Sequence, residues 1–315
     1  MKILGISCGR KNGNSELLLK RALKEAHANG AEVEYLRLQD HYIQQCTGCE
    51  LCSNSDNWPN GRFPESGYFC CYKEDSDHLS YIVDKIKASD GIILSTPIYN
   101  LTVPGSLLVL LNRIHAKNFA KHHEIAGQQH TFCATIAVGG SDMTNLIKPM
   151  LNFTAVELCG SQMNLVDQMV VQFCAPLQYV TLREDAISRA AKLGERMADA
   201  LANPETELYR GAEDNPELCP VCHGDVIQLD GKRFRCPVCN IKGDVAYRED
   251  GTPYMKWDGG AENCRLNDNP DEDLVHEKQR APYAKVRENA ELVKERKAEL
   301  ANWLDPLPVP ELLDR

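Results

Sequence analysis

The sequence Lys2–Ser15, KILGISCGRKNGNS, decides the fold because it joins a strand pattern to a helix pattern through a short polar loop. Ile3, Leu4 and Ile6 form the apolar run, and small, polar and basic residues follow from Ser7 onward. An amphipathic segment begins directly afterwards, so the order is strand, loop and helix. The N-terminus of a helix presents unpaired N–H groups and the positive end of its dipole. The loop is therefore typical of an anion-binding site, and a phosphate group fits it.

Composition narrows the class of protein. The chain has 315 residues, of which 43% are hydrophobic and 25% charged, as in ordinary globular proteins of one or two domains. Its net charge of -10 argues against binding to nucleic acid or to an anionic membrane surface. We find no export signal and no apolar run long enough to cross a bilayer, so we expect a cytoplasmic protein.

Strand and helix patterns alternate along the first two thirds of the chain. After the first strand, strand patterns cover Glu32–Leu38, Gly91–Ser95, Thr131–Val138 and Asn164–Phe173. Helix patterns cover Ser15–Ala28, with Ser15 as N-cap and Gly30 as stop, and then Ser76–Ala88, Ser106–His115, Asn145–Leu158 and Leu182–Leu201. This alternation predicts an α/β fold with a doubly wound, five-stranded parallel sheet.

Three loops follow strands of the predicted sheet. They are Ser7–Ser15, Thr96–Asn100 and Gly139–Ser141. Ligands of doubly wound sheets bind outside the carboxyl ends of the strands, where these loops should meet.

The motifs in these loops resemble those of the NADPH-dependent FMN reductase branch of flavodoxin-like proteins. The first loop reads S-x-G-R-x-x-G-N-S, and T-P-I-Y-N followed by V-P-G resembles the second flavin loop. The resemblance implies FMN, with the flavin N5 as the reacting atom and Tyr99 as the nearest protein acid or base, or else simply a ring that packs there. It assigns Ser7, Arg10, Asn14 and Ser15 to the phosphate, and Pro97, Ile98, Tyr99, Asn100, Gly139 and Gly140 to the ring.

Residues 39–75 form a long cysteine-rich loop, and loops of this length are usually functional. Cys46, Cys49 and Cys52 have the C-x2-C-x2-C spacing that binds three corners of a [4Fe-4S] cluster, and Cys70 or Cys71 could supply the fourth ligand. The combination resembles the iron-sulfur flavoproteins, although those proteins place the fourth cysteine closer. Zinc, or a thiol–disulfide pair without metal, are the alternatives.

The resemblance also implies how electrons would move. FMN would exchange two electrons with NAD(P)H or an organic, quinone-like substrate, and the cluster would pass single electrons to a carrier. The alternative is an electron-transfer or redox-sensing protein without an organic substrate, reduced by ferredoxin. In the iron-sulfur flavoproteins the cluster loop approaches the flavin of another subunit, so a homodimer or homotetramer is expected.

Four more cysteines form a separate motif near the C-terminus. Cys219, Cys222, Cys236 and Cys239 have the spacing C-x2-C-x13-C-x2-C, which predicts a tetrathiolate site on two knuckles. His223 and Asn240 stand where a rubredoxin knuckle carries glycine, so zinc is favoured over rubredoxin-like iron. The remaining cysteines, Cys8, Cys133, Cys159, Cys174 and Cys264, are expected to be buried packing thiols.

The predicted domains follow from these segments. Residues 1–204 form the flavin-binding domain, 205–216 a linker, 217–260 the zinc-ribbon-like module, and 261–315 a C-terminal helix and tail. Apolar residues of the charged segment Asp273–Trp303, such as Val286 and Val293, could pack on the ribbon or on a neighbouring subunit. The helix is expected to be interrupted or restarted at Pro282.

Overall fold

The computed structural model describes residues 1–54, 57–117, 132–147, 151, 165–204, 209–211, 218–259 and 281–301. The chain divides into two compact units, Met1–Asn267 and Asp268–Arg315. The first unit contains a parallel sheet and a small antiparallel sheet, and the second contains helix. Across the described residues, none of the helices has the length and apolarity needed to cross a membrane.

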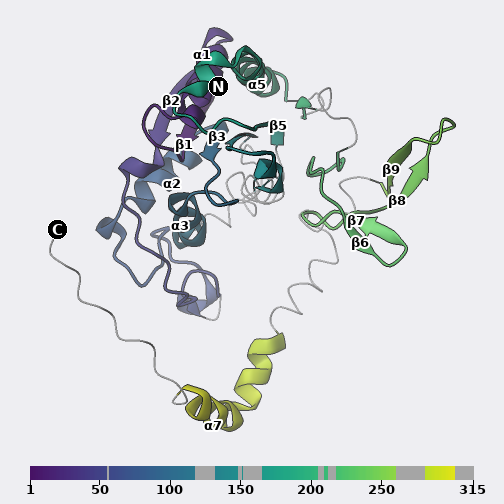
Figure 1. The fold of residues 1–315 in the computed structure, drawn as a ribbon. Helices are drawn as coiled ribbons and strands as arrows, with labels where there is room; N and C mark the ends of the chain where they lie inside the picture. The colour runs from purple at the N-terminus through teal and green to yellow at the C-terminus, as the bar shows by residue number, and fades with distance from the viewer. Residues whose placement is uncertain are drawn as a thin grey trace. The chain divides into compact units, whose positions relative to one another are not determined.

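The first unit is built on the five-stranded parallel sheet that the sequence predicts (Figure 1). Its strands are β1 (Lys2–Ser7), β2 (Glu32–Arg37), β3 (Gly91–Pro97), β4 (Phe132–Val138) and β5 (Leu165–Val171). They lie in the order β2-β1-β3-β4-β5, and every neighbouring pair is parallel. The order changes direction at β1, so the loops after β1 and β3 lie on either side of the switch point.

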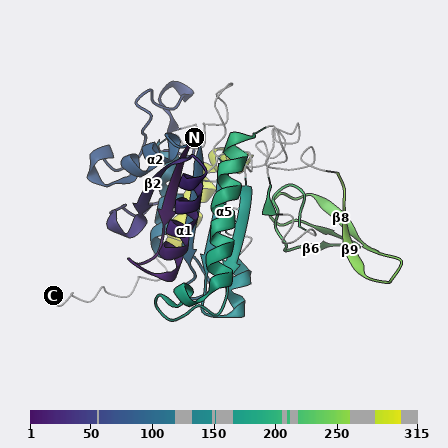
Figure 2. The ribbon, with the colours of Figure 1, turned by 90° about the horizontal axis from the view of Figure 1, so that it is seen from above.

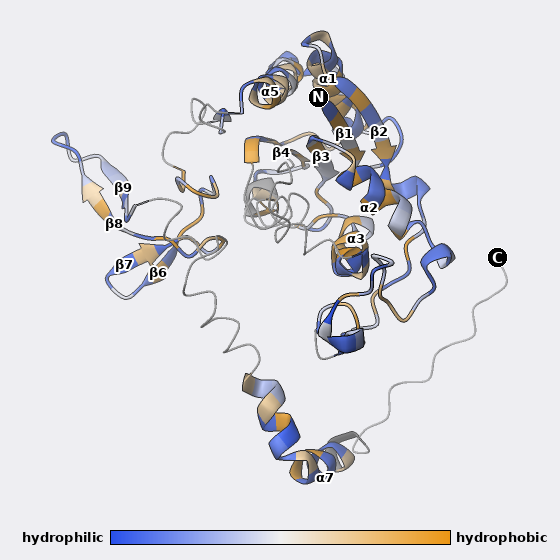
Figure 3. Ribbon diagram, turned by 180° about the vertical axis from the view of Figure 1, so that it is seen from behind, coloured by the Kyte–Doolittle hydropathy of each residue, from blue (hydrophilic) through white to orange (hydrophobic). Residues whose placement is uncertain are grey.

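Helices cover both faces of this sheet. On one face lie α1 (Asn14–Ala28) and α5 (Glu184–Ala202), which run alongside each other in Figure 2. Residues of α2 (Leu79–Lys87) and α3 (Gly105–Arg113) pack into the separate core on the other face. Strands β1, β3 and β4 are buried along nearly their whole length, with apolar residues on both faces. Figure 3 shows orange, apolar residues along strands of this sheet.

The two helices on the first face approach closely at Gly194 of α5. A Cβ placed at residue 194 would lie 2.0 Å from the carbonyl oxygen of Ala22 in α1. No side chain can occupy that space, so glycine is required for this helix pair to pack at the observed distance.

Helix α1 begins one residue before the predicted start. Its N-cap is Gly13, which makes no side-chain capping bond, so the prediction of Ser15 as N-cap is wrong. Instead Glu16, in the first turn, accepts a hydrogen bond from the backbone N–H of Asn12 at 3.2 Å. The predicted stop is confirmed, because Gly30 has φ +89° and its N–H donates to His27.

Short 3-10 helices connect several elements. They are η1 (Leu38–Asp40), η3 (Pro59–Gly61), η4 (Glu74–Ser76), η5 (Ile114–Lys117), η7 (Asp142–Ile147) and η8 (Tyr179–Leu182). The predicted helix Asn145–Leu158 lies mostly outside the described residues, and its described beginning belongs to η7.

The small antiparallel sheet contains two strands that the sequence analysis did not predict. Its order is β6 (Gln228–Asp230), β7 (Arg233–Arg235), β8 (Lys242–Tyr247) and β9 (Pro253–Trp257), and the last two are the additions. Phe234 is fully buried and meets the Trp257 ring edge-on at 4.8 Å between ring centroids. This aromatic pair joins the hairpin of β6 and β7 to β9.

The second unit is helical where it is described. Residues 281–288 are helical, a turn follows at 289, and α7 covers Ala290–Ala301. Pro282 is the second residue of this described helix, which agrees with a restart of the helix at the proline. Val286 and Val293 are exposed on this unit, and their packing on the ribbon or on a neighbouring subunit stays a prediction. Trp303 and the Pro-rich stretch after it lie outside those residues.

Candidate functional site

Loops at the carboxyl ends of β1, β3, β4 and β5 surround one cavity of about 260 Å³. This is the edge where the sequence predicts a ligand. Its lining residues are Arg10, Gly13, Asn14, Ser15, Pro97, Ile98, Tyr99, Val138, Gly139, Gly140, Cys174 and Ala175. Eight of the ten residues that the resemblance assigns to a flavin are therefore brought together.

The first loop places an arginine beside the N-terminus of α1. A tight turn closes the loop, with the N–H of Gly13 donating to the carbonyl of Arg10 at 3.0 Å. The first-turn N–H groups of Asn14, Ser15 and Glu16 have no acceptor within the helix. Together with the exposed guanidinium of Arg10, they form an electropositive end suited to a phosphate group.

Gly9 lies where there is no space for a side chain between this loop and the loop after β3. A Cβ at residue 9 would lie 2.5 Å from Ser15 Oγ and 3.3 Å from Pro97 Cδ. Glycine thus lets the loops after β1 and β3 approach each other beside the cavity. Gly9 and Gly13 were not among the predicted site residues, although both stand in the loop Ser7–Ser15.

Asn14 has a different role from the one the resemblance implies. Its side-chain amide donates to the carbonyls of Cys174 and Pro176, each at 2.8 Å, and its Oδ1 accepts from the N–H of Val180 at 3.2 Å. The side chain is therefore occupied in tying the loop after β5 to α1. Only the backbone N–H of Asn14 remains for an anion.

Two assigned residues do not line the cavity. Ser7 is fully buried at the end of β1. Asn100 lies in a tight turn in which it and Leu101 have φ of 47° and 64°, while Tyr99 and Thr102 exchange backbone hydrogen bonds. The turn holds the half-exposed ring of Tyr99 at the cavity, so Asn100 acts here through the backbone.

Cys174 and Ala175 were missed as lining residues. They follow β5, so the rule that places ligands beyond the carboxyl ends of strands could have found them. Cys174 is buried, as are Cys8 and Cys133, which confirms the packing prediction for these three thiols. Cys159 and Cys264 lie outside the described residues.

A buried ion pair organises the cysteine-rich loop. Arg113, at the end of α3, donates from Nη1 to Asp77 Oδ2 at 3.1 Å and to the carbonyl of Gln44 at 2.9 Å. Its guanidinium also lies over the Tyr72 ring, 4.8 Å from the centroid. Gln44 precedes Cys46, so one guanidinium holds both ends of the loop.

The loop cysteines gather without forming a site for a single ion. Cys46, Cys49 and Cys71 are exposed, while Cys52 and Cys70 are half-buried. A hydrogen bond from the backbone N–H of Leu51 lowers the pKa of Cys49, and burial raises the pKa of Cys52 to about 11. Among described residues, the loop has no three ligand atoms within 4.8 Å of one another.

The four C-terminal cysteines do form a site for a single ion. All four are buried and their sulfur atoms lie within 4.8 Å of one another. Cys219 Sγ and Cys239 Sγ are 3.4 Å apart, and Cys222 Sγ and Cys236 Sγ are 3.2 Å apart. Tetrahedral zinc with Zn–S bonds of about 2.3 Å needs sulfurs roughly 3.8 Å apart, so the donor set fits with a small adjustment.

The knuckles themselves have the predicted geometry. His223 and Asn240 have φ of 55° and 64°, and their N–H groups donate to the carbonyls of Cys219 and Cys236. The left-handed residues after each cysteine pair turn the chain around the metal site, as predicted.

Comparisons with known proteins identify relatives of two kinds. Residues 1–167 match the family model described as NADPH-dependent FMN reductase. An iron-sulfur flavoprotein of Methanosarcina thermophila is 31% identical over 145 residues, which are 45% of this chain and 64% of that protein. The chain thus spans less than two thirds of the length of the iron-sulfur flavoproteins it matches.

The other relatives extend over most of the chain. Flavone synthase cfoJ of Aspergillus candidus is 27% identical over 286 residues, which are 84% of each chain. A solved structure titled "flavone reductase" has a TM-score of 0.71 and 22% identity, and it covers 99% of this chain and 100% of its own. At that identity the likeness establishes a shared fold, and it includes the C-terminal part.

Proposed function

Because the chain belongs to the NADPH-dependent FMN reductase family, we propose that it is an FMN-dependent oxidoreductase acting on a flat organic acceptor. The observation that carries the proposal is the cavity in which the anion-binding end of α1 meets the loops after β3, β4 and β5. FMN has one terminal phosphate and a planar ring, which suit these two parts of the cavity.

The chain's residues would position the cofactor. Arg10 and the first N–H groups of α1 would hold the phosphate, and Pro97, Ile98 and Tyr99 would lie along the ring, with Gly139 and Gly140 opposite. When bound, FMN supplies hydride transfer at N5. The half-exposed Tyr99 offers an aromatic face at the rim, which supports a planar substrate.

The substrate class is inferred from the relatives that run beyond the first domain. Two proteins that match more than four fifths of the chain are named for flavones, whereas the iron-sulfur flavoproteins match less than half of it. We propose an acceptor with a carbon–carbon double bond conjugated to a carbonyl in a flat aromatic system, or a quinone. Such an acceptor gains one hydride and one proton, while NAD(P)H becomes NAD(P)⁺ and solvent supplies the proton.

The two cysteine sites complete the proposal. The cysteine-rich loop would hold a [4Fe-4S] cluster through Cys46, Cys49 and Cys52 with Cys70 or Cys71, in a homodimer or homotetramer. The buried pair of Arg113 and Asp77 supports this role, because it holds the start of the loop at Gln44. The C-terminal four-cysteine site would hold zinc, with iron as the alternative.

The test begins with anaerobically prepared full-length protein. We expect flavin absorption peaks, one zinc per chain, and iron and sulfide in equal amounts near four per chain. NADPH oxidation should accelerate on addition of a flavone or a quinone. Full FMN occupancy without NAD(P)H oxidation, but with reduction by reduced ferredoxin, would favour the electron-transfer alternative. Absence of flavin would contradict the proposal.

A further inference from the structure

The strand β5 has a free edge that other parts of the chain cover. Among the described strands β5 is last in the sheet order, so its outer edge pairs with none of them. Such an edge exposes N–H and C=O groups that need partners. Here the partners come from α5 and from the segment leading into the four-cysteine module.

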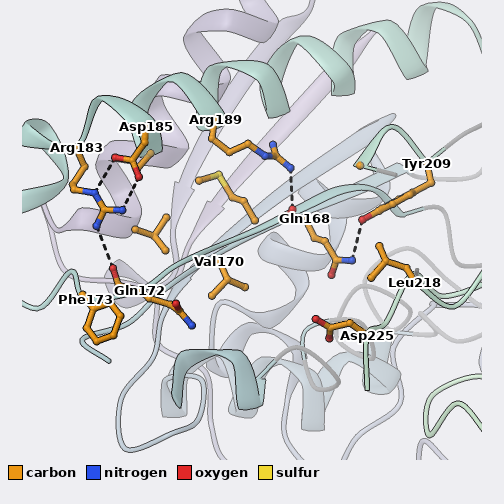
Figure 4. Close-up of a pocket in the computed structure, with 14 residues that line it drawn as sticks. Gln168, Val170, Gln172, Phe173, Arg183, Asp185, Arg189, Tyr209, Leu218 and Asp225 are labelled. Atoms are coloured by element: carbon orange, nitrogen blue, oxygen red, sulfur yellow. Dashed lines mark hydrogen bonds and ion pairs between the residues drawn. The ribbon is translucent and has the colours of Figure 1, made fainter. Parts of the chain in front are cut away.

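Three carbonyls along this edge are satisfied. The carbonyl of Val166 accepts from the N–H of Arg210 at 2.7 Å. The carbonyls of Gln168 and Gln172 accept from the guanidinium groups of Arg189 and Arg183, at 3.0 and 3.3 Å (Figure 4). Polar groups outside the sheet therefore hold β5 in place.

Gln168 also connects β5 to the four-cysteine module. Its side-chain Nε2 donates to Tyr209 Oη at 3.0 Å and to the backbone carbonyl of His223 at 2.5 Å. The ring of His223 stacks on Tyr209 with 3.8 Å between centroids and 5° between planes. His223 directly follows Cys222, so the position of this contact depends on the knuckle around the metal site.

Around this contact the junction is open. A cavity of about 460 Å³ lies between β5, α5 and the module, and it is lined among others by Val170, Gln172, Leu218 and Asp225 (Figure 4). Beside the cavity, Tyr209 packs with Cys133 and Leu165, and Leu218 packs against them. The hydrogen bonds of Gln168 to Tyr209 and His223 are the polar part of this junction, and a substitution of Gln168 removes both.

The other end of β5 belongs to the first cavity. The carbonyl of Val171 accepts from the N–H of Gly139, and the N–H of Cys174 donates to the carbonyl of Gly139, both at 2.9 Å. Cys174 and Gly139 line that cavity, and the carbonyl of Cys174 is held by Asn14 at the start of α1. A shift of β5 would therefore move two walls of the cavity.

We infer that the four-cysteine module is a metal-dependent clamp on β5, so that metal bound at the knuckles strengthens FMN binding at the opposite end of the strand. The inference rests on the proposed function only for the identity of the ligand. Coupling of this kind is reciprocal, so FMN should also slow loss of the metal.

The decisive experiment is a thermodynamic cycle on the full-length protein. The Kd of FMN is measured by flavin fluorescence with zinc bound and after removal of zinc by a chelator. Loss of the two hydrogen bonds that Gln168 donates should weaken FMN binding in the wild type, so we expect its Kd to rise about tenfold when zinc is removed. Gln168→Leu should retain one zinc per chain and show nearly the same Kd in both states.

Gln172→Leu is the matched control, since Gln172 directly follows the same strand but its side chain donates to the carbonyl of Asp142. It should keep the tenfold ratio. Equal Kd values with and without zinc in the wild type would overturn the inference, and so would an unchanged ratio in Gln168→Leu.

A second readout does not depend on FMN. Hydrogen exchange of the β5 amides should accelerate when zinc is removed from the flavin-free wild type. In Gln168→Leu, removal of zinc should leave the exchange rate of these amides unchanged. If FMN fails to bind in every state, the proposed function fails, while this exchange measurement still decides on the clamp. Unchanged exchange in the wild type would refute it.

Discussion

Arg113 Nη1 lies 3.1 Å from Asp77 Oδ2, and the two side chains are only 2% and 0% exposed. Asp77 also accepts from the N–H of Gln44 through Oδ2 and from the N–H of Leu79, in the first turn of α2, through Oδ1. The pair therefore joins the end of α3, the start of α2 and the beginning of the cysteine-rich loop. Removal of either partner leaves a buried charge without compensation.

Asp77→Asn should lower the free energy of unfolding by about 3–5 kcal/mol, because it leaves the buried guanidinium unpaired. Chemical denaturation measures the change. The control is Asp185→Asn, which breaks the exposed pair with Arg183 and should cost no more than about 1 kcal/mol. Equal costs for the two substitutions would show that the buried pair is not a structural centre.

Gly9→Ala should weaken FMN binding by roughly tenfold or more, a loss of about 1.4 kcal/mol. The new methyl group would displace Ser15 Oγ, which lies 2.5 Å from its position, and crowd Pro97. Fluorescence titration with FMN measures the change. Gly105→Ala is the control, since a Cβ there meets nothing within 4 Å, and it should bind FMN like the wild type.

Arg10→Gln should weaken FMN binding by roughly ten- to hundredfold, because a hydrogen bond to a charged group contributes about 1.5–3 kcal/mol. Riboflavin, which lacks the phosphate, provides the comparison. Its affinity should be nearly the same in wild type and variant. A parallel loss for both ligands would place Arg10 away from the phosphate.

The Arg183 guanidinium donates to Asp185 and lowers the pKa of that carboxyl to about 2. A carboxyl whose pKa is lower in the folded state stabilises the fold above the unfolded pKa of about 3.9, and this contribution is lost as the pH falls toward 2. NMR titration of the Asp185 carboxyl should show the low pKa, and Arg183→Gln should return it toward its ordinary value. A normal pKa in the wild type would mean that the pair is broken in solution.

Local sequence was sufficient to predict the sheet and the ligand edge, but not the long-range roles of individual side chains. The strand and helix patterns around Lys2–Ser15 predict β1 and α1 because their periodicity is local. Asn14 was assigned to a phosphate, yet its amide binds carbonyls 160 and 162 residues away, which no local pattern reveals. Ser7 was also assigned to the phosphate, yet it is fully buried. Local sequence does not reveal whether a hydroxyl at the end of a strand is buried or exposed.

The four-cysteine module illustrates the same limit. Its knuckles follow from spacing and from residues that tolerate positive φ. Strands β8 and β9 were missed because β8 has exposed residues on both sides of its ribbon and only Gly243 fully buried, so the usual alternation is weak. The contact of His223 with Gln168 joins two predicted domains and could not be read from either one alone.

The close approach at Gly194 has a consequence for natural variation. Any substitution there would force α1 sideways, because the backbone of Ala22 cannot yield to a methyl group at 2.0 Å. The N-terminal amides of α1 would move with the helix, although every residue around the cavity stayed unchanged. A position far from the ligand can thus disable binding, and homologues that replace this glycine should carry a compensating rearrangement of the whole helix layer.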